Sequence, residues 1–245
     1  AVRRLREDYI PRAFQGVQAE VLVTGDTAYN MDFFDMTADY TPIVFAFVLG
    51  LSFILLTMVF HSLVVPIKAI LLNLLSVGAA YGLIVLVFQE GFLAGLLGFQ
   101  PVPTVEVWIP LFLFSILFGL SMDYHVFLLS RIREHYNQTH DNTESVSFGL
   151  RSTGRIITGA ALIMVAVFAG FASGDLVMFQ QIGFGLAVAI FLDATIVRSV
   201  LVPSTMRLLG RLNWYLPKAL QWLPDLQVEE GRPGRPARVG GTSAH

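Results

Sequence analysis

An acidic residue followed by a tyrosine, Asp123 and Tyr124, interrupts a long apolar stretch of the chain. A carboxylate at the centre of a bilayer costs roughly 2.5–3.5 kcal/mol on insertion scales, and intramembrane acids mark ion or proton pathways. A buried carboxyl can be neutral or ionised, and a tyrosine hydroxyl both donates and accepts hydrogen bonds. We therefore predict a proton relay at Asp123 and Tyr124. The alternative is a static hydrogen bond between helices.

Three neighbours of this pair are supporting candidates. His125 follows it directly and could join a proton path, although a lone histidine in a span is more often a packing residue. Ser121 precedes the pair and is expected to hydrogen-bond a backbone carbonyl or another helix. Gly119 lies one helical turn before Asp123, so we expect another helix to approach closely there.

A second intramembrane acid, Asp193, is followed five residues later by Arg198. Five residues rotate an α-helix by about 140° from the starting face, so the two side chains are not expected to share a face. The long side chain of Arg198 could extend inward along the span, contact another helix, or anchor the helix at the cytoplasmic edge of the membrane. A structural ion pair and a supporting role in proton coupling are equal alternatives for these two residues.

Two acids within a membrane also raise the alternative of an aspartyl protease. The glycine that such proteases carry directly before the aspartate is replaced here by Met122, and no glycine-flanked serine nucleophile is present. The histidines His61, His135 and His140 do not have the spacing of metal ligands. We expect neither an enzyme nor a metal site, and the sequence implies no cofactor.

The elements that position these residues are apolar helices. The chain is 55% hydrophobic and only 14% charged, with a mean hydropathy of +0.66, which is far from the composition of soluble domains. A membrane-spanning helix needs about 20 apolar residues. The sequence therefore predicts an all-α polytopic membrane protein with a five-span bundle over 43–206. The predicted spans are 43–60, 68–88, 108–130, 156–173 and 179–206.

The distribution of charges predicts the topology. Arginines follow the third and fifth spans, whereas the loops 89–107 and 174–177 contain acids and no Lys or Arg. Basic residues favour the cytoplasmic side. The C-terminus is therefore expected in the cytoplasm and the N-terminal segment outside. Tryptophans are expected at the two interfaces with membrane lipids; they are Trp108, Trp214 and Trp222.

The remaining segments have separate expectations. Residues 1–42 resemble the end of an extracytoplasmic α/β domain. We expect a strand over 20–24, a helix over 27–40 capped by Asp26 or Thr27, and Pro42 at the start of the first span.

The connecting and terminal segments are predicted from their polarity and length. We expect a polar inner loop over 131–153, an interfacial or re-entrant turn over 89–106, a cytoplasmic interfacial segment over 207–228 and a disordered tail over 229–245. The chain begins at Ala1 without an initiator Met, and we expect a piece of a larger protein.

Two further features bear on partners and packing. The net charge is −2 and there is no basic patch with interleaved aromatics, so no nucleic-acid partner is expected. Small residues recur four apart in several spans, including Gly183 and Ala187, and this spacing favours close helix packing.

The run Phe118-Gly-Leu-Ser-Met-Asp-Tyr-His-Val-Phe-Leu-Leu-Ser-Arg-Ile-Arg-Glu134 resembles the signature helix of the MMPL (large mycobacterial membrane protein) family, within the resistance-nodulation-division (RND) superfamily. Three other segments, 154–161, 192–203 and 213–217, are similar to the later spans of that family. The resemblance implies a proton-motive-force-driven exporter of lipids or other hydrophobic compounds in the bacterial plasma membrane. It further implies two homologous halves, each with six spans and an extracytoplasmic porter domain.

By this resemblance, the chain corresponds to the end of the second porter domain and the last five spans. Asp123 and Tyr124 match the family's Asp-Tyr pair, which faces an equivalent pair from the N-terminal half, and Phe127 would line the same central region. His125 departs from the glutamate of many relatives. The implied partners are protons, a hydrophobic or lipid substrate and the N-terminal half; a homo-oligomer stays open. A non-transporting membrane sensor or scaffold, similar to sterol-sensing relatives, is the alternative function.

Overall fold

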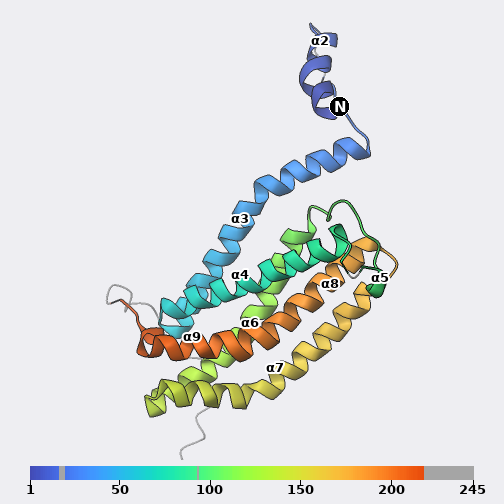
Figure 1. The fold of residues 1–245 in the computed structure, drawn as a ribbon. Coiled ribbons are helices and arrows are strands. Elements are labelled where there is room, and N and C mark those ends of the chain that lie inside the picture. Colours follow the sequence, from blue (N-terminus) through green and yellow to red (C-terminus); the bar gives the residue numbers. More distant parts are fainter. Residues whose placement is uncertain (17–19, 93, 218–245) are drawn as a thin grey trace, which may run out of the picture.

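The computed structural model describes residues 1–16, 20–92 and 94–217. Five helical segments in this part of the chain are long and apolar enough to cross a membrane (Figure 1). They are α3 (Asp26–Phe60), α4 (Val64–Ile84) with the π-helix η2 (Val85–Gln89), α6 (Ile109–Thr139), α7 (Asn142–Ala172), and α8 (Val177–Leu192) with the π-helix η3 (Asp193–Leu201) and α9 (Val202–Leu209). The predicted all-α polytopic membrane fold is confirmed.

The N-terminal segment differs from the prediction. Residues 20–24 form no strand, because no other described segment offers them a partner and an isolated strand leaves its backbone groups unpaired. The helix α3 begins at Asp26 after Gly25, whose φ of 116° favours glycine. Neither Asp26 nor Thr27 is therefore the cap residue. Pro42 lies inside α3 rather than at the start of a helix, and the helix continues on both sides of the lost hydrogen bond.

Before α3, residues 2–13 are also helical. They form α1 (Val2–Arg4), the π-helix η1 (Leu5–Tyr9) and α2 (Ile10–Ala13). Arg6 pairs with Asp32 of α3 and donates to the carbonyl oxygen of Val23, 3.2 Å away. Figure 1 shows these short helices beyond the far end of α3, away from the bundle.

The predicted polar loop over 131–153 is wrong. Nearly all of it is helical, since α6 continues past the apolar stretch and α7 begins before the next one. The connection is a turn of His140 and Asp141 alone. His140 adopts a left-handed conformation with φ 58°, and the Asp141 carboxylate accepts hydrogen bonds from the backbone N–H groups of Thr143 and Glu144 at 2.8 and 3.0 Å. This capping starts a new helix immediately.

The opposite connection, over 90–108, contains the short helix α5 (Ala94–Leu97). The chain is held at the end of the bundle by a hydrogen bond from the N–H of Val102 to the carbonyl oxygen of Phe88 at 2.9 Å. The rings of Phe88 and Phe99 stack with their centroids 4.9 Å apart.

Two apolar clusters form the core. One joins α4, α6 and α8 around Leu113, Phe114 and Leu186, and the other joins the opposite ends of α3, α4 and α6 with α9 around Leu128 and Met206. The helices α7 and α8 approach so closely at Gly183 that a Cβ atom there would lie 2.4 Å from the backbone nitrogen of Ala172. The predicted small-residue packing is present at this position.

The α3–α4 turn and the end of α9 meet at one end of the molecule. The Ser62 hydroxyl donates to the carbonyl oxygen of Asn213 at 2.6 Å, and the N–H of Leu63 donates to the carbonyl oxygen of Tyr215 at 3.2 Å. The α6–α7 turn lies at the same end (Figure 1), so the basic segments predicted to be cytoplasmic gather on one side. Trp222, the remainder of the interfacial segment from 218 and the predicted tail lie outside the described residues.

Candidate functional site

The polar centre of the bundle is an ion pair within one helical segment. Asp193 and Arg198 are 6% and 4% exposed, and Arg198 Nη2 donates to Asp193 Oδ2 at 2.6 Å. The prediction that they do not share a face is wrong. They lie in η3, a π-helix in which residue i bonds to residue i+5, so a separation of five is close to one full turn.

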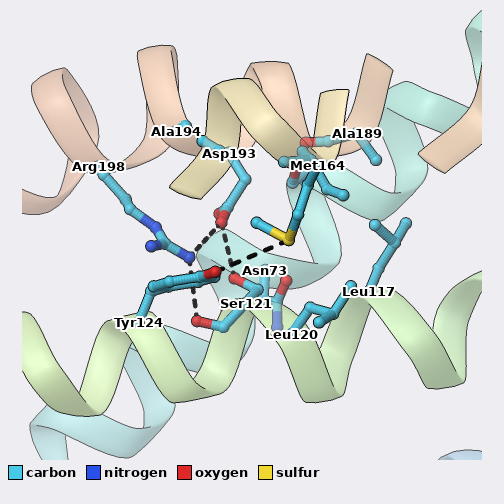
Figure 2. Close-up of a pocket in the computed structure, with 13 residues that line it drawn as sticks. Asn73, Leu117, Leu120, Ser121, Tyr124, Met164, Ala189, Asp193, Ala194 and Arg198 are labelled. Carbon is cyan, nitrogen blue, oxygen red and sulfur yellow. Dashed lines mark hydrogen bonds and ion pairs between the residues drawn. The ribbon is translucent and has the colours of Figure 1, made fainter. Parts of the chain in front are cut away.

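A serine of α6 joins this ion pair to the neighbouring helix. The Ser121 hydroxyl donates to Asp193 Oδ2 at 2.9 Å, and Arg198 Nη2 donates to the Ser121 carbonyl oxygen at 3.1 Å (Figure 2). A charge-assisted contact in a low-dielectric interior is stronger than a neutral one. Asp193 Oδ1 and Arg198 Nε are buried and have no hydrogen-bond partner among the described residues.

Tyr124 faces this ion pair. The Arg198 guanidinium lies over its ring, 4.7 Å from the centroid, which is a cation–π geometry. The Tyr124 hydroxyl donates to Met164 Sδ of α7 at 3.7 Å. Tyr124 therefore connects α6 with both η3 and α7, as Figure 2 shows.

A small cavity lies between these groups. Its volume is about 20 Å³, which is enough for one water molecule. Asn73 and Ser76 of α4 also line it, and Ser76 donates to the carbonyl oxygen of Ala189 at 3.3 Å. The sequence analysis missed these two residues, together with Met164. Asn73 and Ser76 could have been identified from the sequence, because they are two polar residues three positions apart in an otherwise apolar span.

Asp123 lies on a different face of α6 from Tyr124. Its side chain is exposed, and no hydrogen bond or ion pair with the described residues is present. Gly119 and Ser115, four and eight residues earlier, are also exposed, and a Cβ atom on Gly119 would meet nothing within 4 Å. We call Ser115, Gly119 and Asp123 the bare face of α6. Among the described residues no helix packs on Gly119, and the close neighbour expected there stays a prediction.

The remaining candidates lie on the inner side of α6. His125 is 2% exposed and lies within electrostatic range of Asp193, Arg198 and Lys68, but its Nε2 has no hydrogen-bond partner among the described residues. Phe127 is half-buried and packs against the second core cluster. Among the described residues, no group of three His, Cys, Asp or Glu side chains could hold a metal ion.

Comparison with known proteins matches residues 2–233 to the MMPL family model. The chain is 43% identical over 219 residues to the mycolic acid-containing lipids exporter MmpL11 of Mycolicibacterium smegmatis, covering 89% of this chain and 23% of that protein. It is 44% identical over 217 residues to the heme uptake protein MmpL11 of Mycobacterium tuberculosis, covering 88% and 22%.

A third relative is the trehalose monomycolate exporter MmpL3 of M. smegmatis, 37% identical over 212 residues, which cover 86% of this chain and 20% of that protein. The chain thus spans about a quarter or less of the length of these relatives. Their names describe transport and not catalysis, in agreement with the prediction that this chain is not an enzyme. With the five apolar helices and the motif around Asp123, the match over residues 2–233 shows that the chain belongs to the MMPL family of membrane proteins.

Proposed function

We propose that this chain is the C-terminal membrane half of a proton-motive-force-driven exporter, in which Asp123 is the carboxyl that takes up and releases protons. The exposed carboxylate of Asp123, near the middle of an apolar helix and without a partner in the described chain, carries this proposal. Its position is about 21 Å from the start of α6 at 1.5 Å per residue. A charge at that depth facing lipid is too costly to be retained.

The small residues beside Asp123 support a partner helix on this face. Ser115 and Gly119 have little or no side chain, so another helix could approach the α6 backbone there. The partner we infer is the N-terminal half of the same transporter, with its own Asp-Tyr pair. Membrane transporters built from two related halves bind their coupling ions at the interface between the halves.

Tyr124 and the Asp193–Arg198 ion pair lie away from the bare face of α6, and we propose that they support the function of the Asp123 carboxylate. Asp193 and Arg198 are mutually neutralised and hold Ser121 one turn before His125. Arg198 also fixes the ring of Tyr124. We assign Tyr124 the role of relay partner, and Asp193, Arg198 and Ser121 the role of holding α6 in register with η3. Protonation of Asp123 would remove a charge from the bare face, allow the two halves to pack differently, and thereby drive alternating access.

The cargo we propose is a lipid or another hydrophobic compound. Two relatives are named for export of mycolic acid lipids and a third for heme uptake. All three names refer to a large hydrophobic molecule, but they differ in the substrate and in the direction of transport. We place the N-terminal segment outside the membrane and the C-terminus in the cytoplasm, on the basis of the charge distribution.

Transport by the complete protein in proteoliposomes with an imposed pH gradient tests this proposal. The substitution Asp123→Asn keeps the size of the side chain but removes the titration, so we expect transport to fall at least about a hundredfold, with assembly unchanged. Asp175→Asn, in the exposed loop between α7 and α8, is the matched control and should transport normally. Unchanged transport by Asp123→Asn would contradict the proposal, as would wild-type transport that is insensitive to the gradient or to a protonophore. Absence of transport by the wild-type protein would favour the sensor or scaffold.

An intramembrane protease is not supported. Such an enzyme needs two carboxylates that share a water molecule. Asp193 lines the cavity and is occupied by Arg198 and Ser121, whereas Asp123 is exposed on another face of α6 and does not line that cavity.

A further inference from the structure

We propose that the cavity beside Tyr124 binds one ordered water molecule, held between the side-chain amide of Asn73 and the Tyr124 hydroxyl. Asn73 is then a positioning residue for that hydroxyl. This inference rests on the proposed function, in which Tyr124 is a relay partner for protons. The cavity volume of about 20 Å³ admits one water molecule. Residues of α4, α6, α7, α8 and η3 line the cavity, and most of them are buried.

Asn73 lies in the interior of the bundle without a hydrogen-bond partner. It is 2% exposed, and it is the tenth residue of α4, about 14 Å along the helix from Val64. Its amide offers two N–H donors and a carbonyl acceptor, and none of them bonds to the described residues. A buried amide without partners is unfavourable, and buried water molecules supply the hydrogen bonds that such groups lack. The Asn73 amide therefore indicates a polar ligand in the cavity that it lines.

The Tyr124 hydroxyl also has only a weak partner within the described chain. It donates to Met164 Sδ at 3.7 Å, and a thioether sulfur is a weak acceptor. The hydroxyl oxygen accepts no hydrogen bond from the described residues. Tyr124 and Asn73 line the same small cavity (Figure 2). One water molecule there can accept from the hydroxyl and bond to the amide.

The charges around the cavity favour a neutral ligand. Asp193 and Arg198 both line it and neutralise each other, with Arg198 Nη2 donating to Asp193 Oδ2 at 2.6 Å. A further cation would be repelled by the guanidinium, and a further anion would be repelled by the carboxylate. An apolar ligand would leave the Asn73 amide unpaired. Water is small and neutral, and it both donates and accepts hydrogen bonds.

A fixed water molecule would orient the Tyr124 hydroxyl within the proposed relay. The thioether of Met164 carries no proton, whereas a water molecule donates and accepts hydrogen bonds as a tyrosine hydroxyl does. Asn73 would hold this water on the α4 side of Tyr124, away from the bare face of α6. Asn73 acts through the water, so it is a positioning residue and not a member of the relay.

Hydroxyl-radical footprinting with X-rays, applied to the complete protein in lipid, tests the water site, because water beside a side chain supplies the radicals that modify it. Tyr124 and Met164 line the cavity and are readily oxidised residue types. We expect both to be modified in the wild type, whereas Met206, 0% exposed in the other core cluster, should not be. Asn73→Leu keeps the branched shape of the side chain without its polar atoms, so it should lower modification of Tyr124 about tenfold.

Thr57→Val is the matched control for this substitution. It also replaces a buried polar side chain in a span by an apolar one of the same shape. Thr57 lies on α3, donates to the carbonyl oxygen of Phe53 at 2.7 Å and does not line the cavity, so Tyr124 should be modified as in the wild type. Equal modification of Tyr124 in the wild type and in Asn73→Leu, or no modification in the wild type, would overturn the water site.

Transport by the complete protein in proteoliposomes tests the positioning role. Asn73→Leu should slow transport about tenfold, and Asn73→Ser, which restores a hydrogen-bonding oxygen, should recover most of it. Thermal unfolding in detergent separates this effect from loss of the fold. Asn73→Leu should unfold at the wild-type temperature or above it, because the substitution removes an unpaired buried amide.

The failure of this inference can be distinguished from the failure of the proposed function. Normal transport by Asn73→Leu together with lost transport by Asp123→Asn would overturn the role of Asn73 and leave the proposed function intact. Normal transport by both variants would contradict both. Asp123 does not line the cavity, so Asp123→Asn should leave the modification of Tyr124 unchanged.

Discussion

The two intramembrane acids, Asp123 and Asp193, have opposite surroundings. Asp193 is buried and receives hydrogen bonds from Arg198 and Ser121, so its charge is balanced inside the chain. Asp123 has an exposed carboxylate on the bare face of α6. A neutralised, enclosed carboxylate suits structural support, whereas a carboxylate at an open face can respond to what packs there. We therefore propose that Asp123 carries the proton and that Asp193 has a structural role.

The ion pair predicts a pattern of stability changes. Removing one partner of a buried pair leaves an uncompensated charge, so Asp193→Asn and Arg198→Met should each lower the free energy of unfolding by about 3–5 kcal/mol. Unfolding of the purified protein in detergent measures this. The double substitution should cost clearly less than the sum of the two single ones, because neither charge is then left alone. Additive losses would show that the two residues act independently.

At the residue scale, the sequence showed which polar side chains interrupt the apolar helices, but it did not show how these side chains contact one another. Asp123, Tyr124 and Ser121 were identifiable because polar residues are rare in an apolar helix. The contact of Arg198 with Asp193 was not, because it depends on a π-helix and the spacing was read with α-helical geometry. Asn73 and Ser76 come from a segment about 50 residues away, and only the packing of α4 against α6 and η3 brings them to the cavity.

The helices themselves illustrate what hydropathy does and does not predict. All five spans were identifiable because membrane burial requires about 20 apolar residues. Their ends were not, since α3 and α6 continue through polar residues well beyond the apolar stretches. Backbone hydrogen bonds sustain a helix in water as well as in lipid, so polarity alone does not end it. The strand expected over 20–24 depended on partner strands that the described chain does not contain.

Helix packing gives a prediction for the α7–α8 interface. A Cβ atom on Gly183 would lie 2.4 Å from the backbone nitrogen of Ala172 and 2.6 Å from the carbonyl oxygen of Phe168. Backbone atoms cannot move aside as a side chain can, so Gly183→Ala should lower the free energy of unfolding by at least about 1–3 kcal/mol.

The matched control for this substitution is Gly78→Ala in α4. A Cβ atom there meets nothing within 4 Å, and alanine is the better helix former by up to about 1 kcal/mol. This variant should be as stable as the wild type or more stable. Thermal unfolding in detergent distinguishes the two, and a Gly183→Ala protein as stable as Gly78→Ala would show that the close approach of α7 and α8 is unimportant.

On the scale of the whole molecule, the bare face of α6 is the surface on which we propose that a partner half packs. The chain corresponds to about a quarter or less of the relatives it matches, and α3, with 17% of its apolar window buried, is also largely uncovered. A further set of helices packed on these surfaces would enclose Asp123 at the interface between two halves. This proposed arrangement would explain how one chain can have a well-packed core and yet leave its central carboxylate exposed.

The most direct test of the central proposal is to observe the proton on Asp123. Infrared difference spectroscopy of the complete protein in lipid, recorded as the pH is changed, detects the C=O stretching band of a protonated carboxylic acid. We predict a band that grows as the pH falls, is absent from Asp123→Asn and persists in a variant with both Asp193→Asn and Arg198→Met. A band that is unchanged in Asp123→Asn, or that disappears only when Asp193 is replaced, would contradict the assignment of the proton to Asp123.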